Sequence, residues 1–183
     1  SMKNDQIFEL MKYQLHKVCR FLKENEEALA GINNVKVNIS PKELTRKGYC
    51  ENLIAIIRSN GLSPERFQFE ITETCAVNYS KELEDCIRML ENAGITLCLD
   101  DFGCGYANLE RILRLPFSII KMDRSLLCDI GVNPRATIFY QSMVEILHRC
   151  GYQVVSEGVE TRREVEVLES CKVDMIQGYY YAK

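Results

Sequence analysis

Six short segments rich in β-branched and aromatic residues alternate with amphipathic segments along this chain of 183 residues. The segments that predict strands cover 35–40, 67–72, 95–100, 117–123, 152–159 and 174–181. Apolar periodicity predicts helices over 5–24, 48–59, 81–92, 107–115, 134–149 and 162–171. Strands that alternate with helices form right-handed βαβ units on a parallel sheet, so the predicted class is α/β.

Three of the predicted helices begin with capping signals. Ser80 is suited to the N-cap of one helix, and Asn133 followed by Pro134 is suited to the start of another. Thr161 and Glu164 have the spacing of a capping box. These signals place the helix starts independently of the apolar pattern.

The alternation alone leaves two architectures open. One is an open, doubly wound sheet, and the other is part of a (β/α)8 barrel. A G-x-G-x-x-G turn does not follow the first predicted strand, which argues against a dinucleotide-binding open sheet.

Composition excludes several partners. The formal net charge is -3, which argues against sequence-independent binding to a nucleic-acid polymer. Uninterrupted apolar runs are too short to cross a bilayer, so we expect no membrane segment. The nine cysteines are an odd number without a C-x-x-C pair, so we expect reduced thiols in a cytoplasmic protein. With two histidines, a zinc site is not expected.

Polar side chains lie at or near the carboxyl end of every predicted strand. In chain order they are Asn38, Glu70, Asp100 with Asp101, Lys121 with Asp123, Glu157, and Gln177. Each alone is commonly structural, as an edge charge, a lysine that reaches solvent or a hydrogen-bonded amide. Their repeated position favours a shared site, because the carboxyl ends of barrel strands meet at one mouth.

Four of these side chains are carboxylates, namely Glu70, Asp100, Asp101 and Glu157. Burial of a carboxylate is costly unless it is paired or bound to a metal. Oxygen ligands favour Mg²⁺ or Mn²⁺, and the adjacent aspartates suit two ions about 3.5–4 Å apart. We therefore expect metal-assisted chemistry rather than a purely structural role.

Several segments resemble, in order and spacing, the motifs of the EAL-domain family. They are "VNIS", "FEITET", "DDFGCGYANL", "IIKMD", "SEGVET" and "QGYYYAK". The resemblance implies a TIM-type (β/α)8 barrel and a metal-dependent hydrolase of bacterial second-messenger signalling. Its expected activity is hydrolysis of cyclic di-GMP to linear pGpG by in-line attack of water on phosphorus.

The same resemblance implies roles for individual residues. Asn38, Glu70 and Asp100 correspond to ligands of one metal ion, and Asp101 corresponds to a ligand of a second.

The remaining positions correspond to residues that act beside the metal ions. Lys121 would orient or polarise the attacking water, Glu157 would assist the metal and the water, and Gln177 would contact that water. Glu73 would anchor the loop after "DDFG", and Asp123 would contact substrate.

The chain departs from the family pattern at its ends. Glu27-Ala28-Leu29 follows the first predicted helix, where a strand does not fit, so it is not the strand for which the family is named. We expect a single EAL-like domain over 1–183 with six of eight strands, truncated at its N-terminus and ending at Lys183, just short of the family's C-terminal end. Ser1 and Met2 look like a tag remnant.

These departures leave alternatives open. The chain is either a fragment of a longer protein or a subunit whose missing strands come from another chain in a swapped homodimer, formed through exposed barrel edges. The intact parent would then be a cyclic di-GMP phosphodiesterase, with the truncated chain weak or inactive. The alternative is a catalytically impaired module that binds cyclic di-GMP or a protein partner, and a third reading is an inert fragment.

Overall fold

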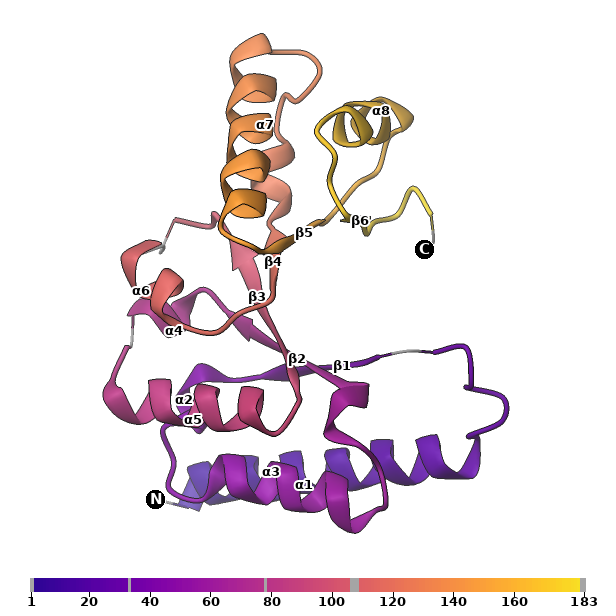
Figure 1. Ribbon diagram of the computed structural model, residues 1–183, viewed down its shortest axis with the longest axis vertical. Coiled ribbons are helices and arrows are strands. Elements are labelled where there is room, and N and C mark those ends of the chain that lie inside the picture. Colours follow the sequence, from indigo (N-terminus) through magenta and orange to yellow (C-terminus); the bar gives the residue numbers. More distant parts are fainter. Residues whose placement is uncertain (1, 33, 78, 106–108, 182–183) are drawn as a thin grey trace. The chain divides into compact units, whose positions relative to one another are not determined.

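The computed structural model describes residues 2–32, 34–77, 79–105 and 109–181 (Figure 1). The strands are β1 (Val35–Ile39), β2 (Phe67–Thr72), β3 (Thr96–Phe102), β4 (Ile119–Met122), β5 (Gln153–Ser156) and β6 (Met175–Ile176). The α-helices are α1 (Met2–Glu24), α2 (Pro41–Leu44), α3 (Tyr49–Ser59), α4 (Thr74–Val77), α5 (Lys81–Asn92), α6 (Leu109–Arg114), α7 (Pro134–Arg149) and α8 (Arg162–Ser170). Two 3₁₀ turns are η1 (Pro64–Arg66) and η2 (Arg124–Leu127).

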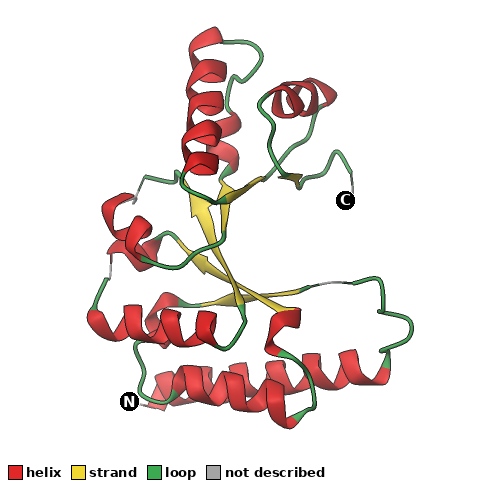
Figure 2. Ribbon diagram, in the orientation of Figure 1, coloured by secondary structure: helices red, strands yellow, loops and turns green. Residues whose placement is uncertain are grey.

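The order of the strands decides between the two predicted architectures. One six-stranded sheet has the order β1-β2-β3-β4-β5-β6, so each strand lies beside its neighbour in sequence. Figure 2 draws the strands in yellow and the helices in red. A doubly wound sheet reverses its strand order at a switch point, whereas a (β/α)8 barrel does not. The α/β class and the six strands are confirmed, and the strand order is that of a barrel.

The chain consists of two compact units. The first comprises Ser1–Glu70 and Asn78–Leu97, and the second comprises Ile71–Val77 and Cys98–Lys183. In the first unit, α3 packs against both α1 and α5 (Figure 1). Leu15, Leu53 and Ile87, one from each helix, are buried in its apolar core.

Cys50 of α3 and Cys86 of α5 form a disulfide in this first unit. The expectation that every cysteine is a reduced thiol is therefore wrong for this pair. The physical reason is tertiary: packing of α3 against α5 brings together two buried side chains that lie 36 residues apart in the sequence. The other seven cysteines form no disulfide.

In the second unit, β4 and β5 pair in parallel and α7 packs on β5. The register places Lys121 opposite Val155 and Met122 opposite Ser156. The Tyr140 hydroxyl of α7 donates a hydrogen bond to Ser156 Oγ at 2.9 Å, and both side chains are fully buried. This contact holds the helix against the carboxyl end of β5.

The predicted helix caps are confirmed. The Ser80 side chain accepts from Leu83 N, the Asn133 side chain accepts from Arg135 N, and Thr161 forms the capping box. Residues 107 and 108 of one predicted helix lie outside the described residues, as do Ser1 and Lys183 at the chain ends.

The sixth strand differs most from its prediction, because Met175–Ile176 replaces the expected 174–181. The chain turns after β6, where Tyr180 N donates to Val159 O. Short helices α2 and α4 were not predicted from the sequence. Among the described residues, the helices fall short of the combined length and apolarity that crossing a bilayer requires.

Candidate functional site

The adjacent aspartates of β3 lie at an irregularity of the sheet. The pairing of β3 with β4 shifts register between Leu99 and Phe102, and Asp101 has a φ of 58°. In a regular strand two successive side chains would point to opposite faces, whereas a bulge re-aims them. As a result, Asp100 and Asp101 both direct carboxylate oxygens to one cluster.

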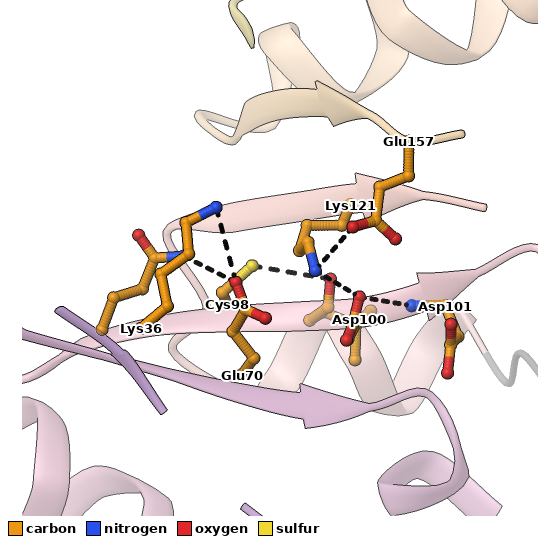
Figure 3. Close-up of polar contacts among 9 residues, drawn as sticks. Lys36, Glu70, Cys98, Asp100, Asp101, Lys121 and Glu157 are labelled. Carbon is orange, nitrogen blue, oxygen red and sulfur yellow. Dashed lines mark hydrogen bonds and ion pairs between the residues drawn. The ribbon is translucent and has the colours of Figure 1, made fainter. Parts of the chain in front are cut away.

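Lys121 lies between two carboxylates of the second unit (Figure 3). Its Nζ is 2.8 Å from Asp100 Oδ1 and 2.7 Å from Glu157 Oε1. The lysine side chain is only 4% exposed. The ammonium group therefore joins the carboxyl end of β3 to the residue that follows β5.

The charges in this cluster shift two pKa values. Burial alone would lower the pKa of Lys121, but hydrogen bonds and attraction from Asp100 and Glu157 outweigh it and raise the pKa. Lys121 is therefore a proton donor in hydrogen bonds and not a base at neutral pH. The pKa of Asp101 is raised by burial and by repulsion from Asp100 and Asp123.

Two groups of potential metal ligands share Asp101. Ligand atoms of Asp100, Asp101 and Glu157 lie within 4.8 Å of one another, and so do those of Asp101, Cys104 and Asp123. The first group supplies hard carboxylate oxygens, which suit Mg²⁺ or Mn²⁺. Burial, together with repulsion from neighbouring carboxylates, raises the pKa of Asp101, so a divalent cation at this position would relieve an existing electrostatic cost.

Glu73, which immediately precedes α4, connects this part of the chain to the loop after β3. Its backbone N donates to Asp100 O at 2.9 Å, and its Oε2 accepts from Gly103 N at 2.9 Å. The side chain is 1% exposed, and Oε1 has no hydrogen-bond partner among the described residues. Glu73 thus holds the loop on either side of Asp101, through its backbone N on one side and its carboxylate on the other.

A pocket of about 310 Å³ brings Gln177 and Asp123 to the same place as Glu157. Its other lining side chains were not identified from the sequence: Arg124, Glu160 and Tyr179. Arg124 Nη1 and Glu160 Oε1 form an ion pair at 2.8 Å. Their position just beyond the polar residues at the ends of predicted strands was the signal that could have identified them.

We expect Gly178→Ala to disturb this pocket. A Cβ at position 178 would overlap the backbone N, C and O of Val159, so the segment carrying Gln177 would have to move. The expected cost is about 1–3 kcal/mol of unfolding free energy, measured by urea denaturation. Gly31→Ala is the control, because a Cβ there meets nothing within 4 Å. Equal stability of the two variants would contradict the close approach.

Asn38 and Glu70 belong to the first unit. Glu70 is buried and forms an ion pair with Lys36, while Asn38 is exposed on β1. Their participation in a metal site stays a prediction from the sequence.

Comparison with known proteins gives consistent matches. The chain is 34% identical over 151 residues to the cyclic di-GMP phosphodiesterase RocR of Pseudomonas aeruginosa, covering 82% of this chain and 38% of that protein. The EAL domain of Mycobacterium smegmatis DcpA aligns with a TM-score of 0.84 and 28% identity, covering 97% of this chain and 80% of that one. Klebsiella pneumoniae BlrP1, in a manganese and cyclic di-GMP complex, aligns with a TM-score of 0.79 and 27% identity, covering 94% and 43%.

The match extends over the chain but not over its relatives. The chain spans between 20% and 38% of the length of three curated relatives that it matches. Residues 2–183 match the EAL domain family. Together with the strand order and the carboxylate cluster at the ends of β3 and β5, these matches show that the chain belongs to the EAL domain family.

Proposed function

We propose that the intact protein containing this chain is a cyclic di-GMP phosphodiesterase. Water adds to one phosphorus of the cyclic dinucleotide, one P–O bond breaks, and the proton of water passes to the leaving oxygen. The product is linear pGpG with one new phosphate end and one new hydroxyl. The observation that carries this proposal is the buried Lys121 held between Asp100 and Glu157 beside a cluster of metal-ligand atoms.

The residues present fit a site for divalent cations. We propose that Asp100 and Asp101 hold Mg²⁺ or Mn²⁺, that two ions bind, and that Asn38 and Glu70 contribute ligands. When bound, such ions supply activation of water and neutralisation of charge on the phosphate. Support comes from the oxygen-rich ligand cluster and from a relative's manganese complex.

We propose the following roles for the side chains of this chain. Lys121, which stays protonated, donates hydrogen bonds to the attacking water or to a phosphate oxygen. Glu157 fixes that ammonium group through its ion pair of 2.7 Å to Lys121 Nζ. Its carboxylate is also the kind of group that can accept a proton from the water. Gln177 and Asp123, which line the adjacent pocket, contact water and substrate. Glu73 holds the loop after β3 in the position that these contacts need.

The test is production of pGpG by the intact protein. We expect cyclic di-GMP turnover with Mg²⁺ or Mn²⁺, loss of turnover in excess EDTA, and recovery when Mn²⁺ is restored. Chromatography of the nucleotide products measures this directly. Tight binding of cyclic di-GMP by calorimetry without turnover would contradict the enzyme and favour a binding module.

Two further expectations belong to this proposal. A cytoplasmic location is supported by the seven cysteines that form no disulfide, although the Cys50–Cys86 pair does not support it. A homodimer formed through the edges of the sheet stays a prediction, which sedimentation of the intact protein would test.

A further inference from the structure

Two neighbouring strands of the first unit place four polar side chains in pairs. On β1, Lys36 and Asn38 are two residues apart, so their side chains share one face of the strand. On β2, Gln68 and Glu70 have the same relation. Asn38 and Glu70 are positions for which a metal-binding role is proposed, and Lys36 is an additional charge beside them.

The Glu70 carboxylate already has a cation and a donor. Lys36 Nζ is 3.6 Å from Glu70 Oε1 (Figure 3). Gln68 Nε2 donates to the same oxygen at 3.3 Å. The Glu70 side chain is 7% exposed, whereas that of Lys36 is 46% exposed. The buried anion is therefore balanced by a lysine whose side chain is partly exposed to solvent.

We infer that Lys36 is a built-in counter-cation that competes with a divalent metal ion for the Glu70 carboxylate. This inference rests on the proposed function, in which Glu70 is a metal ligand. Without metal, the ammonium group offsets the cost of burying the Glu70 charge. Lys36 is a positioning residue in this scheme, because it acts through Glu70.

Arrival of a divalent cation reverses the effect of Lys36. The ammonium group has the same sign as the metal ion, so the two repel each other across the carboxylate. Lys36 must move away from Glu70, and its partly exposed side chain allows it to turn into water. The observed affinity for the metal ion is then lower than the intrinsic affinity of the ligands, because metal binding also breaks the Lys36–Glu70 ion pair.

The test is Lys36→Met, which keeps much of the stem and removes the charge. We expect the intact variant to bind Mn²⁺ about three- to tenfold more tightly by calorimetry than the wild type does. We also expect the metal-free variant to unfold about 2–4 °C lower, because Glu70 loses its counter-charge. Excess Mn²⁺ should remove most of that difference in Tm.

Lys81→Met is the matched control. Lys81 is also in the first unit, its side chain is 69% exposed, and it pairs with Glu84 and Asp85 on the surface of α5. The substitution makes the same change in net charge away from Glu70. Mn²⁺ affinity of Lys36→Met equal to or weaker than that of Lys81→Met would overturn the inference.

A second comparison separates this inference from the proposed function. In the metal-free protein, Lys36→Met and Glu70→Gln should destabilise together less than the sum of their separate effects, because they remove the same pair. Absence of Mn²⁺ binding by the wild type would overturn both the proposed metal site and the competition. Mn²⁺ binding with additive effects of the two substitutions would overturn the competition alone.

Discussion

Lys121→Met is expected to lower kcat for cyclic di-GMP about 10²- to 10³-fold, the usual loss when a buried donor to a transition-state charge is removed. The side chain is buried and donates to Asp100 and Glu157, so water cannot take its place at low cost. Methionine fills a similar volume, which limits the change in packing. Steady-state formation of pGpG measures the effect.

Lys121→Met should not weaken metal binding, in contrast to its effect on kcat. Removing a positive charge from the carboxylate cluster should leave Mn²⁺ affinity unchanged or increase it, as calorimetry would show. Lys81→Met controls for net charge, since Lys81 lies on the exposed surface of α5. A kcat within threefold of the wild-type value would show that Lys121 has no role in the chemical step.

Asp101→Asn should have the largest effect on metal binding. Asp101 is the residue shared by the two groups of ligand atoms, one with Asp100 and Glu157 and the other with Cys104 and Asp123. We expect Mn²⁺ affinity to fall at least about tenfold and turnover to fall about a hundredfold or more, because one substitution affects both ligand sets. Calorimetric titration with Mn²⁺ gives the affinity and the number of ions bound.

Asp85→Asn provides the control for Asp101→Asn. The Asp85 side chain is 61% exposed on α5, where it pairs with Lys81. Asp85→Asn makes the same change of carboxylate to amide as Asp101→Asn does. Unchanged Mn²⁺ affinity and stoichiometry in Asp101→Asn would mean that the cluster is not the metal site.

Much of the fold followed from local patterns in the sequence. The caps at Ser80, Asn133 and Thr161 depend on residues within three positions of each other, so a linear reading is enough to find them. The position of polar residues at strand ends is also local, and it identified Asp100, Lys121 and Glu157. Because the carboxyl ends of parallel strands lie at the same edge of a sheet, a parallel sheet is enough to bring these three side chains together.

The features that were missed depend on register and on packing. The two partners of Lys121 follow from the alignment of β4 with β3 and β5, which the sequence does not specify. Membership of Asp101 in both ligand groups follows from the bulge in β3. The ion pair between Arg124 and Glu160 joins residues that lie 36 positions apart in the chain, so the contact itself depends on tertiary packing.

The covalent bond between α3 and α5 affects any measurement of the stability of the first unit. It closes a loop of 36 residues. By chain-entropy reasoning such a crosslink lowers the free energy of the native state relative to the denatured ensemble by roughly 4 kcal/mol. Dithiothreitol in the buffer therefore decides whether an experiment measures the unfolding free energy of the reduced or of the disulfide-bonded protein. Variants should be compared at one fixed concentration of reductant.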